Sequence, residues 1–270
     1  MRLLFAGSEP KKYRAILLKA GAKNGLESFW SLGQKTPPAQ EEWPGMYLLD
    51  SGGYSARVRG VDIDVKHYAA YLNKHKVKFA FNLDPPDNHE SLQNLYYLQE
   101  NTNTYIIPIY HGPEFKDPKW RKIIDYYVDN YPYIALGGIA GGEVDQETTK
   151  KFLDYVFSRT KKKIAVHGLG MTRQDILNRY PFYSVDSTSW MQMMRFASSK
   201  VHSKNMAKVK AKTNHYTQNI DEDIAWWLKL EQDMTKLWLG RGVDWSDVSY
   251  EYCLENRTMK KWDDEPGRKK

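Results

Sequence analysis

The sequence predicts a single (β/α)8 barrel of the TIM type, and three observations favour this fold. The length of 270 residues suits one such barrel, which usually has about 250 residues in one domain. Short apolar runs alternate with longer amphipathic runs, as expected for buried parallel strands joined by helices. Polar and glycine-rich residues follow the apolar runs, at the strand ends where such barrels carry their active sites. An open, doubly wound sheet is the alternative fold.

Seven segments have the length and composition of buried strands. They are Arg2–Ala6, Met46–Leu49, Lys78–Leu83, Tyr105–Tyr110, Tyr133–Leu136, Ile164–Val166 and Tyr183–Val185. Apolar stripes at helical spacing lie between them, over 65–72, 120–127 and 149–156. An eighth strand is expected after Trp190, where the alternation weakens. Because no repeat or linker divides the chain, residues 1–270 are expected to form one catalytic domain with a helical C-terminal region.

Composition restricts the classes of function. The net charge of +7 favours a polyanionic partner such as nucleic acid. The single cysteine, Cys253, excludes a disulfide framework and a cysteine-rich zinc site, and predicts a reduced, cytoplasmic protein. No apolar run approaches the roughly 18 residues of a membrane span, and the N-terminal run is too short for a signal peptide. We therefore expect no association with membranes.

Chemically active side chains gather after the predicted strands. They are Asp50, Asp84, Asp186, His111, His167 and the glycine run 137–142. Each has an ordinary structural explanation when taken alone: an aspartate before Ser-Gly-Gly can cap a turn, and a lone histidine is often a satisfied structural residue. In a barrel, however, all of them would face one rim. This conjunction is what predicts an active site.

Three carboxylates at one barrel mouth suggest chemistry at a glycosidic bond. One carboxylate can attack an anomeric carbon and form a covalent intermediate. A second can protonate the leaving group and later deprotonate the incoming one. A third can accept hydrogen bonds from the N–H donors of a purine edge. No metal, redox cofactor or other cofactor is required by this scheme.

The order of the motifs resembles that of the tRNA-guanine transglycosylase superfamily. The similarity covers about half of the chain, from Asp50-Ser51-Gly52-Gly53-Tyr54 through Gly137–Glu143 and Gly168-Leu169-Gly170 to Asp186. The family is a (β/α)8 barrel that exchanges guanine for a 7-deazaguanine base. The resemblance implies that Asp186 is the nucleophile at the sugar C1′ and that Asp50 is the general acid and base.

The resemblance also implies how the base is bound. Asp84 would accept from the N1 and N2 edge of the purine, and Tyr54 would stack on its face. The backbone of Gly138 and Ile139 would surround the base. His111 stands where the family has glutamine, which makes its contact with the base oxygen an open question. His167 stands where the family has an apolar residue, and it is included among the candidate substrate-binding residues.

The chain departs from the family in its zinc site. Members that act on tRNA carry three cysteines and a histidine after the nucleophile, and this chain has only Cys253. A compact, zinc-free, basic chain resembles the phage-type enzymes that insert 7-deazaguanines into DNA. The implied partners are DNA and a free, preQ0-like 7-deazaguanine base. A tRNA-acting transglycosylase, a non-catalytic nucleic-acid-binding barrel and a glycoside hydrolase of other lineage are the alternatives.

One segment, 195–212, has the charge expected of a nucleic-acid contact. It carries no acidic residue, and its basic residues are Arg195, Lys200, Lys204, Lys208, Lys210 and Lys212. Such a run could follow a phosphate backbone, with each contact adding salt-sensitive affinity. A solvated helix or loop is the alternative interpretation of the same residues.

Overall fold

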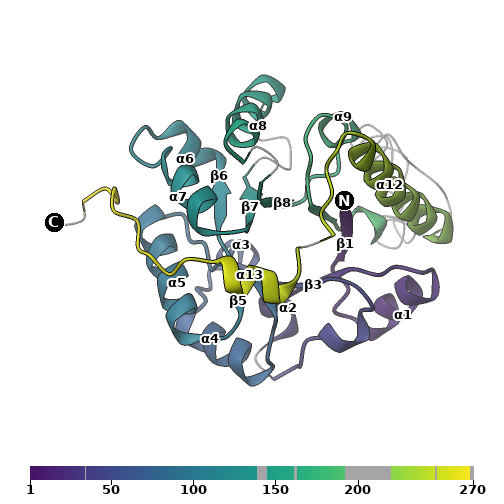
Figure 1. The fold of residues 1–270 in the computed structure, drawn as a ribbon. Helices are drawn as coiled ribbons and strands as arrows, with labels where there is room; N and C mark the ends of the chain where they lie inside the picture. The colour runs from purple at the N-terminus through teal and green to yellow at the C-terminus, as the bar shows by residue number, and fades with distance from the viewer. Residues whose placement is uncertain (34, 139–144, 161–162, 192–219, 247, 268–270) are drawn as a thin grey trace.

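The strands form one parallel sheet that is rolled into a barrel, with helices around its outside (Figure 1). The computed structural model describes residues 1–33, 35–138, 145–160, 163–191, 220–246 and 248–267. Within these ranges the strands are β1 (Arg2–Ala6), β2 (Gly25–Ser28), β3 (Tyr47–Asp50), β4 (Phe79–Phe81), β5 (Tyr105–Ile107), β6 (Ile109–His111), β7 (Tyr133–Gly137), β8 (Ala165–Gly168) and β9 (Ser184–Ser187). The α/β barrel expected from the sequence is thus confirmed, and the open sheet is excluded.

Two short strands bring the ends of the sheet together. The strand order is β5-β4-β3-β2-β1-β9-β8-β7-β6, and its two end members are separated in the chain by Pro108 alone. Asn82 N donates to Ile107 O at 3.0 Å on one side of this segment, and Ala135 N donates to Pro108 O at 2.9 Å on the other. Because proline has no N–H, it interrupts the ladder of hydrogen bonds between strands. The two short strands on either side of Pro108 together occupy one position in the wall of the barrel.

The sequence analysis places an eighth strand after Trp190, but residues 192–219 lie outside the described ranges, and the described residues from 220 onward form no strand. The strand missing from the sequence-based assignment is β2, which lies between β1 and β3 in the sheet. The sequence of β2, Gly-Leu-Glu-Ser, is not an apolar run, because it contains Glu27. The side chain of Glu27 is nevertheless buried. Glu27 Oε1 pairs with Arg14 at 3.2 Å, and its Oε2 accepts from Tyr47 Oη at 2.9 Å. A charged residue inside a strand is tolerated here because distant residues satisfy it.

The helices surround the barrel in chain order. They are α1 (Lys11–Lys19), α2 (Phe29–Leu32), α3 (Gly53–Val58), α4 (Val65–Lys74), α5 (Asn88–Asn101), α6 (Gly112–Lys116), α7 (Ile123–Asn130), α8 (Gln146–Thr160), α9 (Gln174–Leu177), α12 (Ile220–Gly240) and α13 (Tyr250–Asn256), with 3-10 turns η1 (Gln40–Glu42) and η2 (Ser189–Met191). Helix α12 lies beside β1, where Asn24 Nδ2 donates to Glu231 Oε1 at 2.8 Å. None of the helices in the described ranges is long and apolar enough to cross a membrane.

Aromatic side chains fill the barrel near the N-terminal ends of its strands. Phe79 lies 5.8 Å from Tyr105 and 6.1 Å from Tyr133, and Tyr133 lies 5.0 Å from Tyr183, all between ring centroids. Helix α13 covers the N-terminal end of the strands, where Tyr250 Oη donates to Asn103 O. The barrel is therefore a packed core whose open end is the C-terminal one.

Candidate active site

The C-terminal ends of the strands bring the three predicted aspartates and His111 to one mouth of the barrel. Asp50 ends β3, His111 ends β6, and Asp186 lies in β9. Asp84 follows β4, whose last residue is Phe81. Burial raises the pKa of Asp50, and Asp84 and Asp186 are close enough for their charges to raise it further. The three carboxylates therefore share one site.

A tight turn after β3 holds Asp50 at the mouth. Gly52 has a φ of 75°, and a Cβ on it would lie only 2.4 Å from Ser28 Oγ. Both the left-handed backbone and the close approach require glycine at this position. The turn allows Gly52 N to donate to Asp50 Oδ2 at 3.1 Å. Ser51, which is buried, supports the same turn by accepting from Gly53 N.

Asp50 is poised to exchange protons near neutral pH. Burial in the mouth raises its pKa to about 7, with further increases from the charges of Asp84 and Asp186, while backbone N–H donors oppose the shift. A carboxyl group with this pKa is present in both its protonated and its ionised form at pH 7. It can therefore serve as an acid in one step and as a base in the next.

Asp84 is held by a histidine that lies between two carboxylates. His111 Nε2 is 2.9 Å from Asp84 Oδ2, and its Nδ1 is 3.2 Å from Glu114 Oε1. Glu114 Oε2 also accepts from the backbone N of His111 at 2.9 Å. Arg57 approaches from α3 and donates to the backbone carbonyl of Asp84. Both ring nitrogens of His111 are thus engaged by carboxylates, and its contact with the site is made through Asp84.

The imidazole of His111 carries a positive charge at neutral pH. Burial is the largest single influence and disfavours the charge, but hydrogen bonds and attraction from Asp84 and Glu114 together raise its pKa to about 10. The ring fits because β7 ends in Gly137, where a Cβ would lie 2.7 Å from His111 Cδ2. One imidazolium therefore compensates two carboxylates at this side of the mouth.

Asp186 ends a buried chain of hydrogen bonds at the mouth of the barrel. Its Oδ1 lies 3.2 Å from His167 Nε2 and accepts from Gly170 N at 2.7 Å. On the other side of the imidazole, Nδ1 lies 2.7 Å from Ser184 Oγ, which in turn lies 2.6 Å from Tyr133 Oη. His167 and Ser184 are fully buried, so His167 acts on the mouth only through Asp186.

This Ser-His-Asp sequence of contacts is not arranged as a hydrolase triad. In such a triad the serine is the exposed nucleophile and the aspartate lies behind the histidine. Here the order is reversed, because Asp186 keeps 12% of its side-chain surface exposed and Ser184 lies beneath it. Asp186 is therefore the member of this group whose side chain reaches the mouth.

The sequence analysis missed the residues that support the predicted ones. Ser184 precedes Asp186 by two positions, so both side chains point to the same face of β9. Glu114 follows His111 by three residues on α6 and could be recognised only by its spacing. Both signals are weak, since neither residue type is unusual at such a position.

The remaining predicted residues lie around the mouth or outside the described ranges. Tyr54 stands on α3, next to the Asp50 turn, and 72% of its surface is exposed. Gly138 follows β7, is exposed and has a φ of 68°. Ile139 and the basic residues Arg195, Lys200, Lys204, Lys208 and Lys210 lie outside the described residues.

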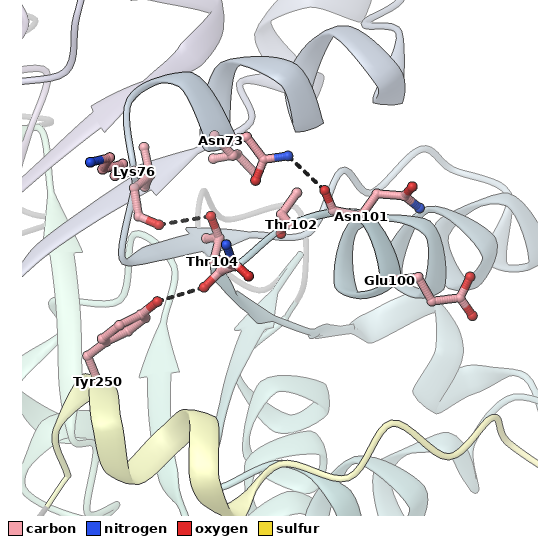
Figure 2. Close-up of a pocket in the computed structure, with 10 residues that line it drawn as sticks. Asn73, Lys76, Glu100, Asn101, Thr102, Thr104 and Tyr250 are labelled. Carbon is pink, nitrogen blue, oxygen red and sulfur yellow. Dashed lines mark hydrogen bonds between the residues drawn. The ribbon is translucent and has the colours of Figure 1, made fainter.

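A separate cavity of about 590 Å³ lies at the opposite end of the barrel (Figure 2). Its lining includes Val77 and Thr104, which precede β4 and β5, together with Asn73 and Tyr250. Thr104 Oγ1 donates to Val77 O, and Asn73 Nδ2 donates to Asn101 O, so these polar groups are already paired. The cavity is thus remote from the carboxylates, at the face that in such barrels serves stability.

Within the described ranges, no group of three histidine, cysteine, aspartate or glutamate side chains could hold a metal ion. Comparison with known proteins adds no assignment, because no family model matches the chain and no curated protein is significantly similar to it.

Proposed function

We propose that this protein is a guanine transglycosylase that exchanges guanine in DNA for a 7-deazaguanine base. The observation that carries the proposal is the convergence of three carboxylates at one mouth, each in a different environment. Asp50 can gain and lose a proton near pH 7. Asp84 is paired with a cationic imidazole, and Asp186 is held by two N–H groups. Three distinct environments suit three distinct roles.

In the first half of the reaction, Asp186 is the nucleophile. A lone pair of its carboxylate forms a bond to C1′ of the sugar while the bond from C1′ to the base nitrogen breaks. The electron pair of that bond goes to the base, and Asp50, in its protonated form, supplies the proton that the leaving guanine needs. The products are a sugar ester of Asp186, free guanine and ionised Asp50.

In the second half, Asp50 acts as the base. It takes a proton from the ring nitrogen of the incoming 7-deazaguanine, whose electron pair then forms the new bond to C1′. The ester bond breaks, and its electron pair returns to Asp186 as a carboxylate. Two successive displacements at C1′ give net retention of configuration. Asp50 ends protonated, so the site is ready for another cycle.

Asp84 is the group that would select the base. One of its oxygens is bound to His111, and the carboxylate keeps further lone pairs for the N1–H and N2–H donors of a guanine-type edge. Adenine offers an acceptor at N1, which would face the negative oxygens of Asp84. A buried mismatch of this kind can discriminate by a factor of roughly 10⁴. The fixed position of Asp84 thus supports guanine and its analogues as substrates.

A nucleic acid is the substrate that best fits the charge of the chain. The net charge is +7, and the basic segment 195–212 contains no acidic residue. A target base must leave the stack before C1′ can reach Asp186, which costs a few kcal/mol. The exposed ring of Tyr54 beside the mouth could receive such a base by stacking. We favour DNA over tRNA because the chain lacks the cysteines of the tRNA-acting enzymes.

The decisive experiment is nucleoside mass spectrometry of DNA and of RNA from cells that express the protein with a supply of 7-deazaguanine. The expected result is a deazaguanine nucleoside in DNA, and its absence in cells that express Asp186→Asn. The modified nucleoside in tRNA alone would assign the tRNA substrate instead. Binding of nucleic acid by the purified protein without any base exchange would instead indicate a non-catalytic barrel.

A further inference from the structure

The buried chain of hydrogen bonds behind Asp186 has no role in the reaction proposed above. It joins Tyr133, Ser184 and His167 through contacts of 2.6 and 2.7 Å, and it reaches Asp186 at 3.2 Å. Tyr133, Ser184 and His167 are each fully buried, in strands β7, β9 and β8. Buried polar groups are costly unless they are paired, so this chain must have one consistent arrangement of hydrogens.

The direction in which these hydrogen bonds donate follows from the groups at the two ends, Asp186 and Tyr133. A carboxylate oxygen can only accept, so the imidazole hydrogen facing Asp186 must be on Nε2 of His167. If the ring is neutral, Nδ1 accepts from the Ser184 hydroxyl, whose oxygen accepts from the Tyr133 hydroxyl. Every hydrogen then has an acceptor. If the ring were cationic, the hydrogens would run the other way, and that of Tyr133 would meet no acceptor among the described residues.

The same chain distinguishes the two oxygens of Asp186. Oδ1 faces two N–H groups, those of Gly170 and of His167, whereas none of the described residues donates to Oδ2. We infer that His167 is a positioning residue, which holds Asp186 so that Oδ2 is the oxygen that attacks C1′. This inference rests on the proposed function.

Positioning of this kind helps both halves of the reaction. In the first, fixing Oδ1 leaves the Oδ2 lone pairs directed at the mouth, which removes the orientational freedom that a solvated carboxylate would have to lose. In the second, the carboxylate is the leaving group, and its returning charge is stabilised by the two N–H groups already aimed at Oδ1. His167 neither gains nor loses a proton in either half.

Two substitutions of His167 separate positioning from simple filling of the core. In His167→Gln, the amide nitrogen lies near the place of Nε2 and can still donate to Asp186. In His167→Asn, the shorter amide lies near the place of Nδ1 and can bond only to Ser184. Both variants are polar and smaller than histidine, so their effects on folding should be similar and can be compared by thermal denaturation.

Steady-state exchange of labelled guanine is the assay. We expect His167→Asn to lower kcat by a factor of about 100 with little change in KM, as for the loss of one preorganised donor. His167→Gln should retain kcat to within a factor of about 10. Equal losses in the two variants, in proportion to their melting temperatures, would show that His167 is merely structural and would overturn the inference.

The tautomer can be measured without any activity. Nitrogen NMR of protein labelled at its seven histidines, with the signal assigned by its loss in His167→Asn, should show hydrogen on Nε2 and none on Nδ1. If the NMR shows hydrogen on Nδ1 and the protein does exchange guanine, the inference about His167 is overturned while the proposed function stands. The expected tautomer without exchange on any nucleic acid would instead refute the proposed function, and the inference would fall with it.

Discussion

Replacing Asp50 with asparagine should stabilise the folded protein at neutral and alkaline pH while it abolishes base exchange. Asp50 has a pKa of about 7 in the folded protein because of burial and of the charges on Asp84 and Asp186. Its ordinary value, which applies in the unfolded chain, is 3.8. Between these two values the folded state binds more protons at Asp50 than the unfolded state does. Stability therefore falls as the pH rises through this range and levels off above pH 7.

The size of the effect follows from the shift. A change of about three pH units corresponds to about 4 kcal/mol, at 1.36 kcal/mol per unit, and this is an upper limit for the cost of ionising Asp50 in the folded state. Asparagine keeps the shape of the side chain but carries no charge. Asp50→Asn should accordingly raise the free energy of unfolding by about 1–4 kcal/mol at pH 8 relative to its effect at pH 4.

Urea denaturation of the wild type and of Asp50→Asn at pH 4 and pH 8 would measure this difference. Asp62→Asn is a matched control, because Asp62 is exposed in the loop that follows α3. An equal effect of Asp50→Asn at both pH values, or a loss of stability at pH 8, would refute the reasoning. The experiment tests the electrostatics of the mouth without assuming any particular substrate.

Three further outcomes are expected. Asp84→Asn should lower exchange of guanine and 7-deazaguanine alike, measured with labelled bases, since the amide replaces one acceptor with a donor; full activity with both would show that Asp84 only ends a strand. Glu114→Gln should lower the pKa of His111 from about 10, visible in an NMR titration. A raised histidine pKa stabilises the folded state at low pH, and this stabilisation is lost as the pH rises through 10. Glu114→Gln should therefore lower the free energy of unfolding by about 1–3 kcal/mol at pH 6 and by less at pH 10. An equal loss at both pH values would contradict this. Neutralising Lys204, Lys208 and Lys210 together should make the slope of log affinity against log salt shallower by about 0.9 for each lost contact with duplex DNA. An unchanged slope would identify the segment 195–212 as solvated.

Most strands could be predicted because they are determined by local composition. A parallel strand buried on both faces must be apolar over a few residues, and seven segments of the chain met this condition. Strand β2 did not meet it, because it contains Glu27. This residue can be buried because Arg14 pairs with it and Tyr47 donates a hydrogen bond to it, both from other parts of the chain. A strand whose burial depends on distant partners has no local signature, so its place could be found only in the fold.

The candidate site divides in the same way. The sequence by itself determined that Asp50, Asp84 and Asp186 stand at or just beyond the C-terminal ends of strands. The rule that parallel strand ends meet at one mouth places them together. Only the tertiary structure decided that His111 pairs with Asp84 and that His167 supports Asp186. These partners come from different strands, and their distances depend on sheet register and barrel curvature, which no single segment encodes. The pKa of Asp50 depends on the same distances, since burial and neighbouring charges act through space rather than along the chain.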